Sequence, residues 1–66
     1  MNIKINGKIQ VVDKNINLLE LIKSLGLSSC RVVTEYNLRI VPTEEREKTF
    51  LKENDSLEII SFVGGG

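Results

Sequence analysis

Apolar residues alternate with polar ones at the start of the chain. Ile3 and Ile5 alternate with polar neighbours, and the alternation resumes at Ile9 and Val11 after the Asn-Gly pair at positions 6–7. A period of two predicts a strand with one buried face. Asn-Gly between two such runs predicts a type I′ turn, because that turn needs positive φ at both central residues. We therefore predict an N-terminal β-hairpin.

The next segment changes to helical spacing. Its apolar residues fall at i, i+3, i+4 and i+7, namely Leu18, Leu21, Ile22 and Leu25. This spacing predicts an amphipathic helix over about 18–25, whose apolar face covers a sheet. Asn17 and Glu20 have the spacing of a capping box, which would begin the helix. Gly26 stands where a left-handed residue commonly ends one.

The following residues predict short strands separated by a charged segment. Residues 31–36 read as a third strand, followed by a turn over 37–39. A short strand at 40–41 is then ended by Pro42, which has no N–H to donate to a ladder. The run "TEEREK" has too few apolar residues for a full helix, so we predict one irregular turn with a solvated charged face.

The last predicted strand has two different faces. Leu57 and Ile59 are expected to face the helix, whereas Ile60 and Phe62 point the other way. The element order predicts an α+β fold in which one main helix covers a mixed sheet of four to five strands. We predict one domain over residues 1–63 and a flexible three-glycine tail over 64–66.

Composition narrows the possible functions. The 66 residues carry 9 basic and 9 acidic side chains, and this zero balance disfavours nucleic-acid or membrane-surface partners. The chain has no His, the commonest general base and metal ligand, and no pattern of catalytic or metal-ligating residues stands out. Without a signal peptide or an apolar run of about 20 residues, we expect a cytoplasmic protein.

Cys30 is the single cysteine, so it forms no internal disulfide. It could be a sulfur-relay thiol or pair with a partner protein. Because no His is present to activate it, we interpret it instead as a small buried residue of the loop after the helix.

Four stretches spread along the whole chain resemble a known family: "IKINGK", "LLELIKSLGL", "VVTEYNLRIVP" and "ENDSLEIISFVGGG". The sequence resembles the ThiS family, the ubiquitin-like sulfur carriers of thiamin thiazole synthesis. The most specific features are the "IVP" step and the acidic turn before a strand that ends in Val-Gly-Gly-Gly. Family members usually have Gly where Leu38 stands, so the turn there, and with it the choice of partner, is in question.

The resemblance implies a β-grasp fold, as in ubiquitin, and chemistry at the C-terminus. An E1-like adenylating enzyme (ThiF type) would activate the carboxylate of Gly66 with ATP and magnesium. A sulfur donor such as a cysteine desulfurase would then supply sulfur for a thiocarboxylate, and thiazole synthase (ThiG type) would accept that sulfur. The chain itself would bind no cofactor and would act as a co-substrate, not as an enzyme.

The glycine tail suits this role. A channel built for backbone would admit Gly64 and Gly65, because they carry no side chains and reach most φ values. Ile60, Phe62 and Val63 lie next to the tail and form a candidate docking surface for partner enzymes. Alternatively, Phe62 folds back over the sheet edge.

Three other functions use the same fold. The chain could carry sulfur for another pathway, such as molybdopterin synthesis. It could be a protein modifier joined to lysines through Gly66. It could also be a β-grasp binding module whose tail has no role. The destination of the activated carboxyl group separates the carriers from the modifier, and deletion of the tail separates both from the binding module.

Overall fold

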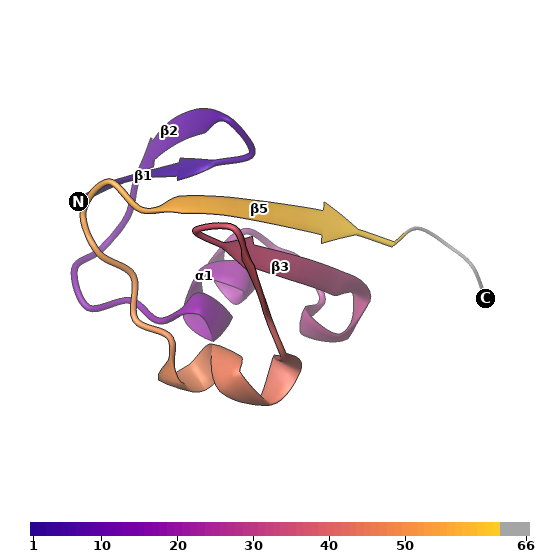
Figure 1. The fold of residues 1–66 in the computed structure, drawn as a ribbon. Coiled ribbons are helices and arrows are strands. Elements are labelled where there is room, and N and C mark those ends of the chain that lie inside the picture. Colours follow the sequence, from indigo (N-terminus) through magenta and orange to yellow (C-terminus); the bar gives the residue numbers. More distant parts are fainter. Residues whose placement is uncertain (63–66) are drawn as a thin grey trace.

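Five strands form one mixed sheet in the computed structural model of the chain, which describes residues 1–62 (Figure 1). The strands are β1 (Asn2–Ile5), β2 (Lys8–Val11), β3 (Val32–Tyr36), β4 (Arg39–Val41) and β5 (Ser56–Ser61). Their order across the sheet is β2-β1-β5-β3-β4, and β1 pairs with β5 in parallel. The last strand in the sequence is therefore the central one. This α+β arrangement, with one main helix on the sheet, confirms the predicted fold class.

Both hairpins turn through left-handed residues. Asn6 and Gly7 have φ values of 50° and 85°, which confirms the predicted turn between β1 and β2. Asn37 and Leu38 have φ values of 48° and 73° in the turn between β3 and β4. Leu38 thus adopts the geometry that a glycine would take there, at a cost of roughly 1–2 kcal/mol. Leucine at position 38, in place of the glycine usual in the family, therefore does not prevent the β3–β4 hairpin.

The main helix, α1 (Leu18–Ser24), begins at the predicted capping box. The Glu20 N–H donates to Asn17 Oδ1 at 2.8 Å, and the Asn17 N–H donates to Glu20 Oε1 at 3.0 Å. Gly26 is left-handed, with φ of 76°. The helix ends one residue earlier than predicted, so Leu25 is exposed instead of buried with the rest of the apolar face. No helix within residues 1–62 is long and apolar enough to cross a membrane.

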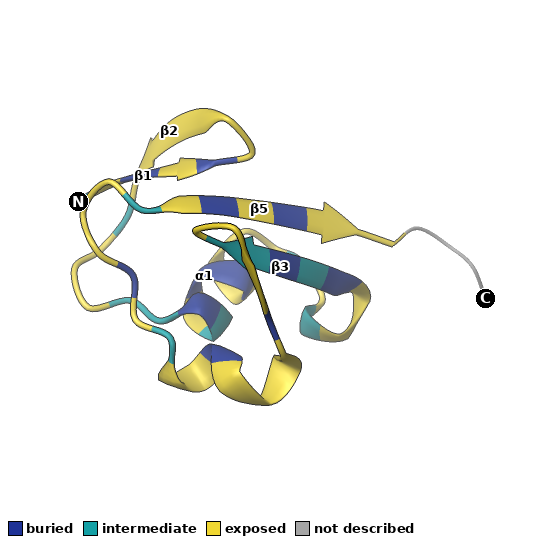
Figure 2. Cartoon of the chain, in the orientation of Figure 1, coloured by how far each residue is buried: buried dark blue, intermediate teal, exposed yellow. Residues whose placement is uncertain are grey.

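The core lies between α1 and one face of the sheet. Its buried apolar residues are Ile3, Ile5, Leu18, Leu21, Ile22, Val32, Val41, Leu51, Leu57 and Ile59. Figure 2 shows buried and exposed residues alternating along β5, as expected for a strand with one covered face. Within residues 1–62, no helix lies on the opposite face of the sheet (Figure 1).

The charged segment forms a 3₁₀-helix, η2 (Thr43–Lys48), where we predicted an irregular turn with a solvated face. That prediction is wrong at Arg46, which is only 2% exposed. The Arg46 guanidinium donates to the backbone carbonyl of Ser29, and to that of Val32 at 2.6 Å. Arg46 thereby ties η2 to the short 3₁₀-helix η1 (Ser29–Arg31) and to the start of β3.

Candidate functional site

β5 ends shortly before the predicted glycine tail in the sequence. β5 pairs with β3 as far as Ser61, which lies opposite Val32. The pairing extends one residue further, because the Phe62 N–H donates to the Arg31 carbonyl at 2.8 Å. Strand geometry therefore continues to the last described residue.

Four predicted site residues, Val63, Gly64, Gly65 and Gly66, lie outside the described residues. The flexible tail, its passage through a partner's channel and the modification of Gly66 therefore stay predictions.

The other edge of β5 is held by a side chain. Backbone pairing with β1 joins Lys4 to Ser56 and Ile5 to Leu57. Beyond that point the Asn6 side chain continues the ladder: Oδ1 accepts from the Ile59 N–H at 2.7 Å, and Nδ2 donates to the Ile59 carbonyl at 3.1 Å. Hydrogen bonds therefore fix β5 on both of its edges as far as Ile59.

Ile60 and Phe62 are exposed on the sheet face opposite the helix. Their exposed fractions are 57% and 60%, whereas Leu57 and Ile59 are buried on the helix side. The predicted orientation of these four side chains is correct. The exposure of Phe62 argues against the alternative that it folds back over the sheet edge. Their role in docking stays a prediction.

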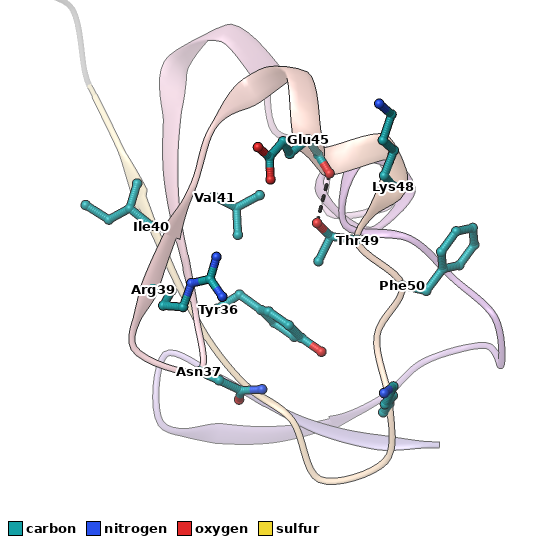
Figure 3. Close-up of a pocket in the computed structure, with 10 residues that line it drawn as sticks. Tyr36, Asn37, Arg39, Ile40, Val41, Glu45, Lys48, Thr49 and Phe50 are labelled. Carbon is teal, nitrogen blue, oxygen red and sulfur yellow. Dashed lines mark hydrogen bonds between the residues drawn. The ribbon is translucent and has the colours of Figure 1, made fainter.

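The register continues this face of the sheet across β3, where Val33 and Glu35 are half-buried, and β4. Val33 lies opposite Ile60, Glu35 lies opposite Glu58, and Ile40 lies opposite Glu35. We call these five residues the outer face. Ile40 is 67% exposed, and Figure 3 shows it pointing away from Arg39 and Val41. Sequence reasoning missed this extension, because a sequence does not give the register between strands.

Cys30 lies in η1 and is exposed, so the expectation that it is buried is wrong. Its Sγ is 3.2 Å from the Ser28 hydroxyl oxygen. That hydrogen bond is the main reason why the pKa of the thiol is lowered, and the Arg31 charge adds to the effect. The residue has the expected place in the chain, after the helix and before β3.

A cavity of about 450 Å³ opens beside the β3–β4 turn (Figure 3). It is lined by Tyr36, Asn37, Arg39, Ile40, Val41, Glu45, Lys48, Thr49, Phe50 and Lys52. β5 ends at the other end of β3, because Val32 pairs with Ser61 and Tyr36 with Leu57. The cavity therefore contains none of the residues predicted to act at the C-terminus.

Tyr36 gives this region a measurable pH dependence. Its hydroxyl donates to Asp55 Oδ2 at 2.5 Å. Burial, and then the hydrogen bond and charge of Asp55, raise the pKa of Tyr36 from 10.0 to about 12. Because the folded-state pKa is the higher one, the stabilisation is complete below pH 10 and is lost as pH rises towards 12.

We expect an ultraviolet titration of the folded protein to give a tyrosinate midpoint near 12. Tyr36 is the only tyrosine and the chain has no Trp, so the signal reports one group. Asp55→Asn should lower the midpoint, since it removes the charge while burial remains. A wild-type midpoint at 10.0 in protein that circular dichroism shows to be folded would contradict the expectation.

Comparison with known proteins decides the family. The model of the ThiS family matches residues 3–66. The chain belongs to the ThiS family. The similarity extends to the fold: the crystal structure of a thiamine biosynthesis protein (ThiS) from Geobacter metallireducens superposes with a TM-score of 0.85 at 33% sequence identity, and each chain is covered completely. The β-grasp fold that the resemblance implied is thereby confirmed.

Two kinds of relative share the whole length of this ThiS-family chain. An uncharacterized protein, ycf40, from Pyropia yezoensis is 38% identical over 66 residues, which are 93% of its length. A thiazole synthase from Paramagnetospirillum magneticum is 35% identical over 66 residues, but the chain spans only 20% of that relative's length. A unit similar to this ThiS-family chain is therefore part of a longer protein in some relatives.

Proposed function

We propose that the chain is a sulfur carrier of thiamin thiazole synthesis. The observation that carries the proposal is the match of residues 3–66 to the ThiS family, which includes the three terminal glycines. The geometry supports it, since β5 comes shortly before those glycines in the sequence and hydrogen bonds on both of its edges hold the strand in place.

The proposed chemistry begins with adenylation of the Gly66 carboxylate by an E1-like enzyme of ThiF type. That enzyme uses ATP and magnesium. One carboxylate oxygen bonds to the α-phosphorus of ATP as pyrophosphate leaves, so that this oxygen becomes the bridge to AMP. A donor such as a cysteine desulfurase holds the sulfur as a persulfide, which a thiol reduces to sulfide. The sulfide then attacks the acyl carbon. The new C–S bond forms as the C–O bond to AMP breaks. The carrier contributes the acyl group and its presentation, so it acts as a co-substrate.

The proposed acceptor of the sulfur is thiazole synthase. Two relatives named thiazole synthase, from Paramagnetospirillum magneticum and Magnetococcus marinus, each contain a stretch similar to the whole chain. Joining two proteins in one chain raises their effective concentration, which is useful when they act in succession. These relatives support a thiazole synthase as the carrier's partner. A reducing cytoplasm, where Cys30 stays a thiol, is the proposed setting.

The experiment that tests the proposal is intact mass spectrometry. The pure protein is incubated with its cognate adenylating enzyme, magnesium-ATP and a sulfur source, beside a variant that lacks Gly66. We expect a mass gain equal to the exchange of one oxygen for one sulfur, and only in the wild type. No gain, with an enzyme proven active on another carrier, would contradict the proposal. A bond between Gly66 and a lysine of another protein would indicate a modifier instead.

A further inference from the structure

Two glutamates are paired across neighbouring strands at the centre of the outer face. Glu35 and Glu58 are directly paired across β3 and β5, a placement that brings Cβ atoms to about 4.5–5.5 Å. Like charges in such positions are destabilising. An opposite charge would offset this repulsion between the two glutamates, and it could come from the chain itself or from a bound partner.

The chain does not supply that compensation within residues 1–62. The carboxylates that accept hydrogen bonds there belong to Glu20, Glu53 and Asp55. By register the nearest cation on the adjoining β1 is Lys4, which lies opposite Ser56, two residues before Glu58. Glu58 is exposed and Glu35 is half-buried, and within residues 1–62 no hydrogen bond or ion pair joins either carboxylate to a cation.

Apolar side chains frame this charge. Ile60 and Val33 form the next pair towards the tail, and Ile40 lies beside Glu35 on β4. Ile40 and Ile60 are both more than half exposed. A surface with a charged centre and an apolar surround suits a partner group that has a cationic head and an apolar stem.

We propose that the outer face docks a protein surface that presents an arginine between Glu35 and Glu58, with apolar neighbours against Ile40 and Ile60. Arginine suits this position best, because its planar guanidinium carries five N–H donors and binds carboxylates in pairs. Its methylene stem packs on apolar side chains. The inference deepens the proposed function, on which it rests for the identity of the partner, the adenylating enzyme.

The test is direct binding of the carrier to the adenylating enzyme without ATP. The double variant Glu35→Gln, Glu58→Gln keeps the size of both side chains and removes the repulsion, so it should fold at least as stably. We expect its dissociation constant to rise roughly tenfold or more, because a charge at the partner's surface loses its counter-charges. The wild-type affinity should also fall with added salt, and that of the variant much less.

The matched control is Glu44→Gln, Glu47→Gln, which changes the net charge equally at exposed positions of η2. We expect its affinity to stay within about twofold of wild type, because these residues lie outside the outer face. Equal losses in both double variants would indicate an effect of net charge and overturn the inference. Unchanged binding of the Glu35, Glu58 variant would overturn it as well.

Mass spectrometry of the same samples separates this inference from the proposed function. In one outcome, the wild type binds the enzyme but gains no sulfur, and the Glu35, Glu58 variant binds more weakly. This outcome would reject the carrier function and support the docking site. Wild type that gains sulfur while the variant binds equally well would support the function and reject the docking site.

Discussion

Replacing Arg46 with alanine is expected to destabilise the protein by about 3 kcal/mol, since hydrogen bonds to charged groups contribute about 1.5–3 kcal/mol each. The guanidinium is buried and donates to the carbonyls of Ser29 and Val32. Alanine would leave both carbonyls without this donor and open a cavity under η2. Small domains are stable by only roughly 5 kcal/mol, so the variant should be partly unfolded at modest temperature.

Urea unfolding followed by far-ultraviolet circular dichroism measures this effect. Arg39→Ala is the matched control, because Arg39 is exposed on β4 and its loss should change the free energy of unfolding by less than about 0.5 kcal/mol. Arg46→Lys keeps the charge but not the planar fork, so its stability should fall between those of wild type and Arg46→Ala. Equal stability of the two alanine variants would show that the buried guanidinium adds nothing.

The double variant Ile60→Ser, Phe62→Ser is expected to raise the Michaelis constant of the adenylating enzyme for the carrier by about thirtyfold. Both side chains are more than half exposed beside the tail, so their replacement should leave the fold intact. Truncating central apolar contacts of an interface costs about 2 kcal/mol or more, which corresponds to this change. The turnover number should change little, since the tail that reacts is untouched.

ATP–pyrophosphate exchange at varied carrier concentration measures both constants. Phe50→Ser is the matched control, because Phe50 is 53% exposed but lies beside the cavity instead of on the outer face. A Michaelis constant within about threefold of wild type for the double variant would remove the docking role of Ile60 and Phe62. An equally large rise of the Michaelis constant in Phe50→Ser would indicate that the adenylating enzyme contacts the cavity side of the carrier.

Structural features that depend only on consecutive residues were predicted correctly from the sequence. The Asn6-Gly7 turn, the capping box of Asn17 and Glu20 and the alternation along β5 each depend on a few consecutive residues. The glycine tail was found in the same way, because three glycines after a strand are visible in the sequence.

Features that depend on distant segments were missed. Arg46 is buried because folding brings it to the carbonyls of Ser29 and Val32, which are 17 and 14 residues away. The pairing of Glu35 with Glu58 follows from the register of β3 against β5, and the alternation within each strand says nothing about it. The sequence therefore predicted which face of β5 is exposed, but not what lies beside it.

The central position of β5 also affects how the protein is made. β5 is the last strand to leave the ribosome, yet it fills the gap between β1 and β3. Until it arrives, the N-terminal hairpin and the β3–β4 hairpin have no strand to join them. Contacts between the two ends of a chain are slow to form, because a long loop must close first. A nascent or truncated chain that lacks β5 should therefore stay unfolded.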